Sequence, residues 1–195
     1  MHVKHLKHLV VSKWADRIHS PFVFDIYYYL LKGKEIPYCS KNIKQTFQLN
    51  GIDLLIGHCI FKLWHKLKPK TALCVSNKPM ANCLFIANAY KCKIDLLCDK
   101  EIPKELIDQV QKIPTLTKNK YDSVLIDIND NDLENLEFQE LQFILVTHIH
   151  TDKKQAFTWR KIRNNTLHNV CLDFFYFGIS FQRPNQANEY FRLRF

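Results

Sequence analysis

Before its midpoint the chain reads Thr71-Ala72-Leu73-Cys74-Val75-Ser76-Asn77-Lys78-Pro79-Met80. The first five residues are apolar and partly β-branched, which predicts a buried strand. The next five break that strand, and Ala81 to Tyr90 has the composition of a helix packed on it. A strand–loop–helix unit of this kind commonly holds a nucleotide-like cofactor through glycines, which let the backbone approach the ligand and adopt positive φ. This loop has no glycine.

After Thr71 the chain alternates between strand-like and helix-like segments, as a parallel sheet requires. The predicted strands are Lys93 to Cys98, Tyr121 to Ile128 and Gln142 to Thr147, with Val170 to Phe181 as one long strand or a hairpin around Tyr176-Phe177-Gly178. The predicted helices are Pro103 to Lys112 and Asp152 to Arg163. We therefore expect an α/β fold, with a mostly parallel sheet and antiparallel pairing at one edge.

The first ~70 residues predict helices. Leu6, Leu9, Val10 and Trp14 share one helical stripe. Ser20-Pro21 is a helix start, with an N-cap residue before proline, and Gly33 ends that helix. A third helix runs from about Ile52 to Leu67, and Pro69 closes it. We expect a helical N-terminal extension over residues 1–68 and a core over residues 69–195, together forming one compact unit.

Composition describes an ordinary globular chain of 195 residues, 47% of them hydrophobic. Charges interrupt the apolar stretches well before ~18 residues, so we expect no membrane span. The N-terminus lacks the apolar core and cleavage site of a signal peptide, which favours a cytoplasmic location. The 7 cysteines include no CxxC pair. Neither a disulfide framework nor a cysteine zinc site is therefore predicted.

Three surface features leave alternatives open. The net charge of +9 and the lysines from Lys62 to Lys70 allow nucleic-acid binding, but we favour a solvated helix face opposite Leu63, Trp64 and Leu67. His2, His5 and His8 recur every three residues, and we interpret them as a polar helix edge at a mobile terminus, not as a metal site. We interpret the aromatic residues from Phe174 to Phe181 as part of the core together with an edge strand, which a second subunit of a homo-oligomer would cover.

Polar residues follow the predicted strands at their carboxyl ends, where open sheets bind ligands. Asp99 comes ~20 residues after the first loop, where an acid commonly accepts the ribose hydroxyls of a nucleotide. Acids also end strands for reasons of turn chemistry, so this signal is weak alone. Asp127 lies near the end of the next predicted strand.

Three stretches resemble a family of small bacterial class I S-adenosylmethionine-dependent methyltransferase-like proteins. They are His19-Ser20-Pro21-Phe22-Val23-Phe24-Asp25, Pro69-Lys70-Thr71-Ala72-Leu73, and Gly178-Ile179-Ser180-Phe181-Gln182-Arg183-Pro184-Asn185-Gln186-Ala187 continuing through Phe191-Arg192-Leu193-Arg194-Phe195. The resemblance runs over nearly the whole chain. It implies a Rossmann-like methyltransferase fold with a terminal antiparallel strand, S-adenosylmethionine as cofactor and a small-molecule or other methyl acceptor. It implies Ser76, Asn77, Asp99, Asp127 and Asn129 as cofactor-binding residues.

The chain departs from the family where the cofactor would bind. The family's first loop resembles E-L-G-T-S-x-G, whereas this chain has Cys74 at the acid and Ser76 and Met80 at the glycines. Pro79 removes an N–H donor. The family's Asp-Gly-Asn-His is here Asp127-Ile128-Asn129-Asp130, and a later Asp-Asp pair is Thr147-His148. These departures predict weakened or lost cofactor binding. The non-enzymatic alternative is a retained scaffold that binds partners through its basic and aromatic surfaces.

A less favoured hypothesis is a metal-dependent hydrolase. His148, His150 and Asp152 resemble the H-x-H-x-D metal-binding run of metallo-β-lactamase-type enzymes. Lys153 stands where that run needs a further histidine, and no Gly-Gly follows. Too little chain remains after Asp152 for the later ligands. We therefore interpret His148 and His150 as loop residues at a strand end.

Overall fold

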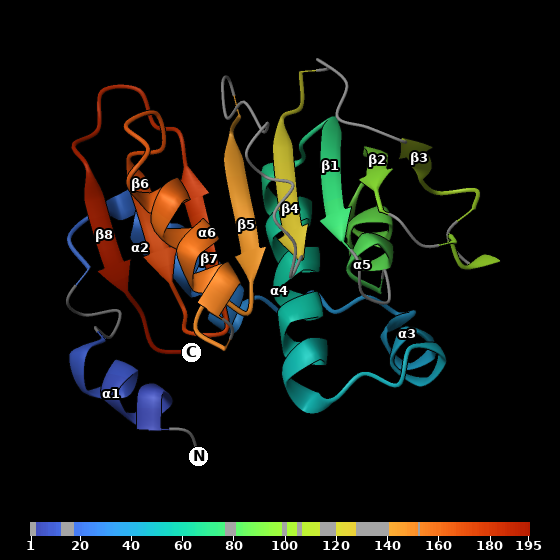
Figure 1. Cartoon of the computed structure of the whole chain (residues 1–195), viewed down its shortest axis with the longest axis horizontal. Helices are drawn as coiled ribbons and strands as arrows, with labels where there is room; N and C mark the ends of the chain where they lie inside the picture. The colour runs from blue at the N-terminus through green and yellow to red at the C-terminus, as the bar shows by residue number, and fades with distance from the viewer. Residues whose placement is uncertain are drawn as a thin grey trace.

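The computed structural model describes residues 3–12, 18–76, 81–98, 101–104, 107–113, 120–127, 141–151 and 153–195. Its strands form an eight-stranded sheet in the order β3-β2-β1-β4-β5-β7-β6-β8 (Figure 1). The strands are β1 (Thr71–Ser76), β2 (Lys93–Leu97), β3 (Gln111–Ile113), β4 (Ser123–Asp127), β5 (Phe143–Thr147), β6 (Val170–Asp173), β7 (Phe177–Phe181) and β8 (Glu189–Arg192). The helices are α1 (Val3–Val11), α2 (Pro21–Lys32), α3 (Ser40–Thr46), α4 (Gly51–Leu67), α5 (Ala81–Ala89) and α6 (Lys153–Arg163).

The strand directions confirm the predicted α/β fold. Strand β1 pairs in parallel with β2 and β4, and β4 pairs in parallel with β5. The segment from Val170 to Phe181 is a hairpin, in which β7 runs antiparallel to both β5 and β6. The last strand, β8, runs parallel to β6, so the expectation of a terminal antiparallel strand holds for β7 and not for the end of the chain.

The helix predicted from Pro103 to Lys112 is wrong. Within the described part of that segment, residues 107–109 form a turn and Gln111 begins β3. Strand β3 extends the sheet by pairing with β2 in the register Asp95 to Gln111. Because a helix this short is marginal by itself, backbone hydrogen bonds to the open edge of β2 are the more favourable outcome.

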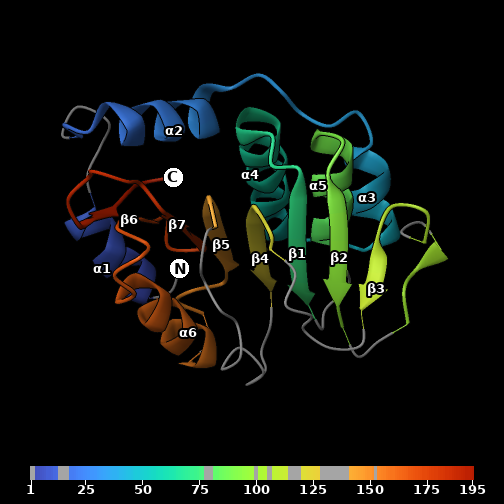
Figure 2. The ribbon, with the colours of Figure 1, turned by 90° about the horizontal axis from the view of Figure 1, so that it is seen from above.

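The two faces of the sheet are buried against different helices. Figure 2 shows α2, α3, α4 and α5 on one side of the sheet and α6 on the other. Side chains alternate between the two sides along each strand, as the strand repeat of two dictates. In β1, Ala72 and Cys74 join the core under α4, whereas Leu73 and Val75 join the core under α6.

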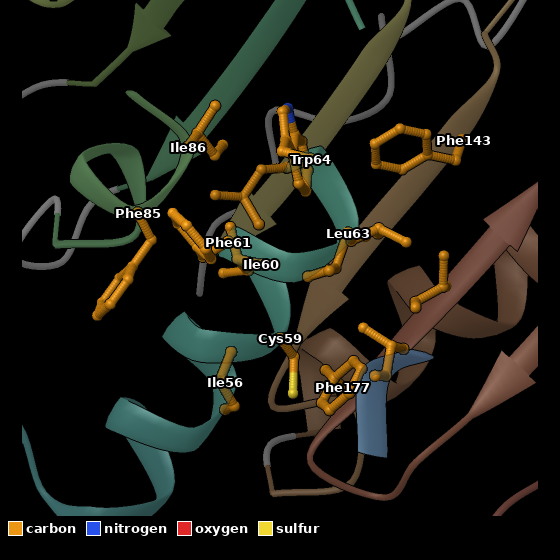
Figure 3. Close-up of a cluster of buried hydrophobic side chains, with 14 of the residues drawn as sticks. Ile56, Cys59, Ile60, Phe61, Leu63, Trp64, Phe85, Ile86, Phe143 and Phe177 are labelled. Carbon is orange, nitrogen blue, oxygen red and sulfur yellow. The ribbon is translucent and has the colours of Figure 1, made fainter. Parts of the chain in front are cut away.

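Helix α4 is the centre of the larger core (Figure 3). Its N-cap, Asn50, accepts hydrogen bonds from the backbone N–H groups of Ile52 and Asp53. Trp64 is fully buried, and its ring lies edge-on to Phe143 with the centroids 4.7 Å apart. Lys62 is not on a solvated face as predicted, because its buried ammonium donates to the carbonyl of Leu30 at 2.9 Å.

Two stretches that carried the family resemblance lie against each other. Ser20 is the N-cap of α2, as predicted, and its hydroxyl accepts from Gln186 Nε2 at 3.2 Å. The guanidinium of Arg183 lies over the Phe22 ring, 4.2 Å from its centroid. The N-terminal and C-terminal stretches therefore form one packed unit on the β7 side of the sheet.

Helix α1 is held by the last residues of the chain, so the interpretation of His8 as part of a polar helix edge is wrong. His8 is buried, and its Nε2 donates to the carbonyl of Leu193 at 3.1 Å. Arg194 donates to the carbonyl of Leu9 at 2.6 Å. His2 lies outside the described residues. Among the helices described, none has the length and apolar character needed to cross a bilayer.

Gly57 is required where α4 meets α5. A Cβ at Gly57 would lie 2.2 Å from the Phe85 ring, whereas a Cβ at Gly51 of the same helix would meet nothing within 4 Å. We expect Gly57→Ala to lower the free energy of unfolding by roughly 1–3 kcal/mol through overpacking. Gly51→Ala should leave it unchanged or raise it by up to about 1 kcal/mol. Urea unfolding followed by circular dichroism measures both, and equal stability of the two variants would contradict the close packing.

Candidate functional site

A small pocket lies at the carboxyl ends of β4 and β5, where the first turns of α4 and α5 meet the sheet. Its volume is about 80 Å³. The residues that line it are Leu49, Asp53, Ile56, Ala81, Asn82, Asp127 and His148. The pocket combines an apolar wall with two carboxylates, one amide and one imidazole, but its volume is well below the roughly 300–1,000 Å³ of pockets that enclose a whole small molecule.

Asp127 is fixed at the base of the pocket by two side chains. Asn82, in the first turn of α5, donates its amide to Oδ2 at 2.9 Å. Thr147, the last residue of β5, donates its hydroxyl to Oδ1 at 2.5 Å. Asp127 is only 3% exposed, so these bonds replace the water that its carboxylate loses on burial. The carboxylate is therefore held rigidly between two neighbouring strands and a helix.

His148 is held in a strained backbone conformation beside Asp53. Its φ is +55°, in the left-handed region that residues other than glycine rarely adopt. Its N–H donates to the carbonyl of Tyr176 at 2.5 Å, and its own carbonyl accepts from the Thr151 N–H at 3.0 Å. The ring Nε2 lies 3.5 Å from Asp53 Oδ1. A strained backbone persists only where the surrounding structure stabilises it, and such residues are common at functional sites.

Two polar residues of β1, Ser76 and Cys74, differ in what their side chains can do. The buried hydroxyl of Ser76 forms no hydrogen bond within the described part of the chain, and Ser76 pairs in register with Asp127. Cys74 stands where the resembling family has an acid. A hydrogen bond with Cys83, together with burial, raises the pKa of the Cys74 thiol well above its usual value. This thiol is therefore neutral near pH 7 and cannot replace the charge of a carboxylate.

The structure places only part of the predicted site. Asp127 lines the pocket, and Ser76 lies on the neighbouring strand end without lining it, so cofactor binding by these two residues stays a prediction. Asn77, Asp99 and Asn129 lie outside the described residues.

Sequence reasoning missed Asp53 and Asn82. Asp53 lies in the first turn of α4, after the N-cap Asn50. Asn82 lies in the first turn of α5, after the segment that follows β1. Their closeness to Asp127 depends on where α4 and α5 pack.

The histidine run after β5 splits between two partners. His148 lies beside Asp53 in the pocket, whereas His150 Nε2 lies 2.8 Å from Asp173 Oδ2 at the end of β6. Asp152 lies outside the described residues. Both histidines are loop residues after a strand, as predicted. The division of their partners does not favour the hydrolase hypothesis, which needs the two imidazoles on shared metal ions.

Comparison with known proteins rests on structure, because no protein-family model and no curated protein matches the sequence. An SAH-bound methyltransferase from Podospora anserina superposes with a TM-score of 0.56 at 11% identity, covering 85% of this chain and 97% of that one. An O-methyltransferase from Bacillus cereus in complex with SAH gives 0.51 at 10% identity, covering 80% and 96%. An O-methyltransferase from Streptomyces achromogenes in complex with SAM gives 0.50 at 13%, covering 82% and 96%.

These similarities extend over most of both chains, at identities that establish the fold alone. The sheet order, the antiparallel β7 and the helices on both faces agree with them. The chain has a Rossmann-like methyltransferase fold, mostly parallel with an antiparallel edge.

Proposed function

We propose that this chain is a methyltransferase-like protein that binds S-adenosylmethionine weakly at the carboxyl ends of β1, β2 and β4. The observation that carries the proposal is the pocket at this edge, where Asp127 and His148 lie together on adjacent strand ends. Ligands of open α/β sheets bind at this edge. The structural neighbours that hold SAH or SAM share the fold.

The described residues fit a nucleoside cofactor in part. The unpartnered, buried hydroxyl of Ser76 is a polar group of the kind that a ligand satisfies. Asp99 would accept the ribose hydroxyls, and Asp127 and Asn129 would lie beside it. Two features oppose tight cofactor binding. Both carboxylate oxygens of Asp127 already accept hydrogen bonds from the protein. The loop sequence has Pro79 and Met80 where a cofactor-binding loop has glycine. Weak binding follows from this combination.

His148 is the residue best placed to move a proton. The cofactor would supply an electrophilic methyl group, and an acceptor hydroxyl must lose its proton as the methyl transfers. Asp53 lies 3.5 Å from His148 Nε2, so it orients the ring and stabilises the imidazolium that forms when His148 takes a proton. The substrate class is therefore a small molecule with an acidic hydroxyl group.

The first prediction concerns cofactor affinity. Calorimetric titration with S-adenosylmethionine or its demethylated product should give a dissociation constant weaker than about 100 μM. Asp99→Ala should weaken it further by about 1–3 kcal/mol, the cost of an unpaired polar partner. Micromolar binding by the unmodified protein would show that the loop does not impair the site. Complete absence of binding would favour the non-enzymatic scaffold.

The second prediction isolates the loop. Ser76→Gly combined with Met80→Gly should tighten cofactor binding, because the close approach of the backbone that glycine allows outweighs the loss of the Ser76 hydroxyl. Isothermal titration of the double variant beside the unmodified protein provides the comparison. Unchanged affinity in the double variant would assign the weakness to the segments after Asp99 and Asn131.

The third prediction concerns catalysis. At saturating cofactor, His148→Gln should lower the rate of methyl transfer to a phenolic or catecholic acceptor by roughly 10²–10⁴-fold, the usual contribution of a general base. Asp53→Asn should lower it less. His65→Gln, which removes a histidine of α4 outside the pocket, is the matched control. A radiolabelled methyl-transfer assay measures all three, and full activity of His148→Gln would refute the assignment.

A further inference from the structure

Three metal-ligating side chains from distant parts of the sequence meet beside the β6–β7 hairpin. His8 comes from α1, His150 from the turn after β5, and Asp173 from the end of β6. One ligand atom from each lies within 4.8 Å of the other two. Within the described part of the chain this is the only such group of three or more histidine, cysteine or acidic residues.

The distances within the group suit a single small cation. His150 Nε2 lies 3.1 Å from Asp173 Oδ1 and 2.8 Å from Oδ2, and His8 Nδ1 lies 3.7 Å from Oδ1. Tetrahedral zinc with bonds of about 2.0–2.1 Å places its nitrogen and oxygen ligands roughly 3.3–3.4 Å apart. The observed separations lie on both sides of that value.

The outer contact of His8 fixes which of its nitrogens faces the group. A carbonyl only accepts hydrogen bonds, so His8 Nε2 must carry the proton that it donates to Leu193. In a neutral imidazole this leaves a lone pair on Nδ1, which faces the Asp173 carboxylate. Two acceptors that face each other are stabilised by a cation between them.

Hydrogen bonds from neighbouring groups fix the orientation of the Asp173 carboxylate, as is common for carboxylates that bind metals. It is fully buried, and it accepts from the Tyr190 hydroxyl at 2.5 Å and from the Phe175 N–H at 2.9 Å. Outer partners of this kind orient the ligands of metal sites.

Phe175 forms an apolar wall for both imidazoles. Its ring centroid lies 5.3 Å from that of His150 and 5.4 Å from that of His8. Phe175 adopts a φ of +70°, and this left-handed conformation turns the hairpin directly after Asp173. The ring limits water around His8 and Asp173, while the side chain of His150, 32% exposed, leaves an approach from solvent.

We propose that His8, His150 and Asp173 bind one zinc ion through two imidazole nitrogens and one carboxylate oxygen. This donor set suits zinc over magnesium or calcium, which prefer oxygen ligands. A fourth position is left for water or another small ligand. The site lies apart from the pocket that contains His148, so it goes beyond the proposed function and does not depend on it. The sequence did not point to this combination of ligands, because His8 lies more than 140 residues before His150 and Asp173.

Zinc binding is tested directly on the untagged, full-length protein after chelator treatment. Titration with Zn²⁺ by calorimetry should show one equivalent bound, and Co²⁺ should give the visible absorption of a four-coordinate ion. Zn²⁺ should also raise the thermal unfolding temperature, since a ligand that binds only the folded state stabilises it. Absence of a stoichiometric site in both titrations overturns the proposal.

Variants assign the ligands. His8→Gln and His150→Gln should each lower zinc affinity by more than the roughly 10–100-fold that outer-contact changes cost. Asp173→Asn should act in the same direction, but His150→Gln is the more informative change because the half-buried side chain of His150 tolerates replacement better. The control is His148→Gln, two residues away, which should keep the bound equivalent.

Two outcomes refute this assignment. If His148→Gln and His150→Gln each abolish zinc binding while His8→Gln does not, the ion lies on the histidine run after β5. Unchanged zinc affinity in both His8→Gln and His150→Gln would leave the three side chains as a hydrogen-bonded support for the hairpin. Retained folding of each variant is checked by its circular dichroism spectrum.

Discussion

The antiparallel pairing of β7 with β5 is the constraint on which the rest of the structure depends. It runs from Phe143 opposite Phe181 to Thr147 opposite Phe177, so the hairpin turn lies at the carboxyl end of β5. There the Tyr176 carbonyl accepts the N–H of His148 and holds its left-handed backbone. The same turn brings Asp173 to His150. The pocket and the proposed zinc site are thus both set by one strand pairing.

Most of the sheet was predictable because its strands are short apolar runs bounded by turn residues. The central strands β1, β4 and β5 are buried on both faces, and such strands show in sequence as continuous apolar segments. Strand β3 was missed because it buries only Ile113 and owes its conformation to the neighbouring β2. Strand β8 likewise depends on the edge offered by β6. Edge strands of this kind have little signal of their own.

The site was predictable where it lies on strand ends and unpredictable where it depends on packing. Asp127 could be placed because the end of a predicted strand fixes its position. Asp53 could not, because its distance to His148 depends on how α4 packs in the fold, including the close approach of Gly57 to Phe85 of α5. The burial of His8 was missed for the same reason. Its partner Leu193 lies 185 residues away, and no local pattern encodes such a contact.

The contacts between α1 and the last residues of the chain have a consequence for how the protein is made. Helix α1 is the first described helix to leave the ribosome, whereas its partner Leu193 is added 185 residues after His8. The entropy cost of closing a loop grows only slowly with its length, so the long separation weakens the docking of α1 only slightly. The late synthesis of its partners delays that docking. Helix α1 therefore cannot dock until the segment that carries Leu193 and Arg194 has been synthesised.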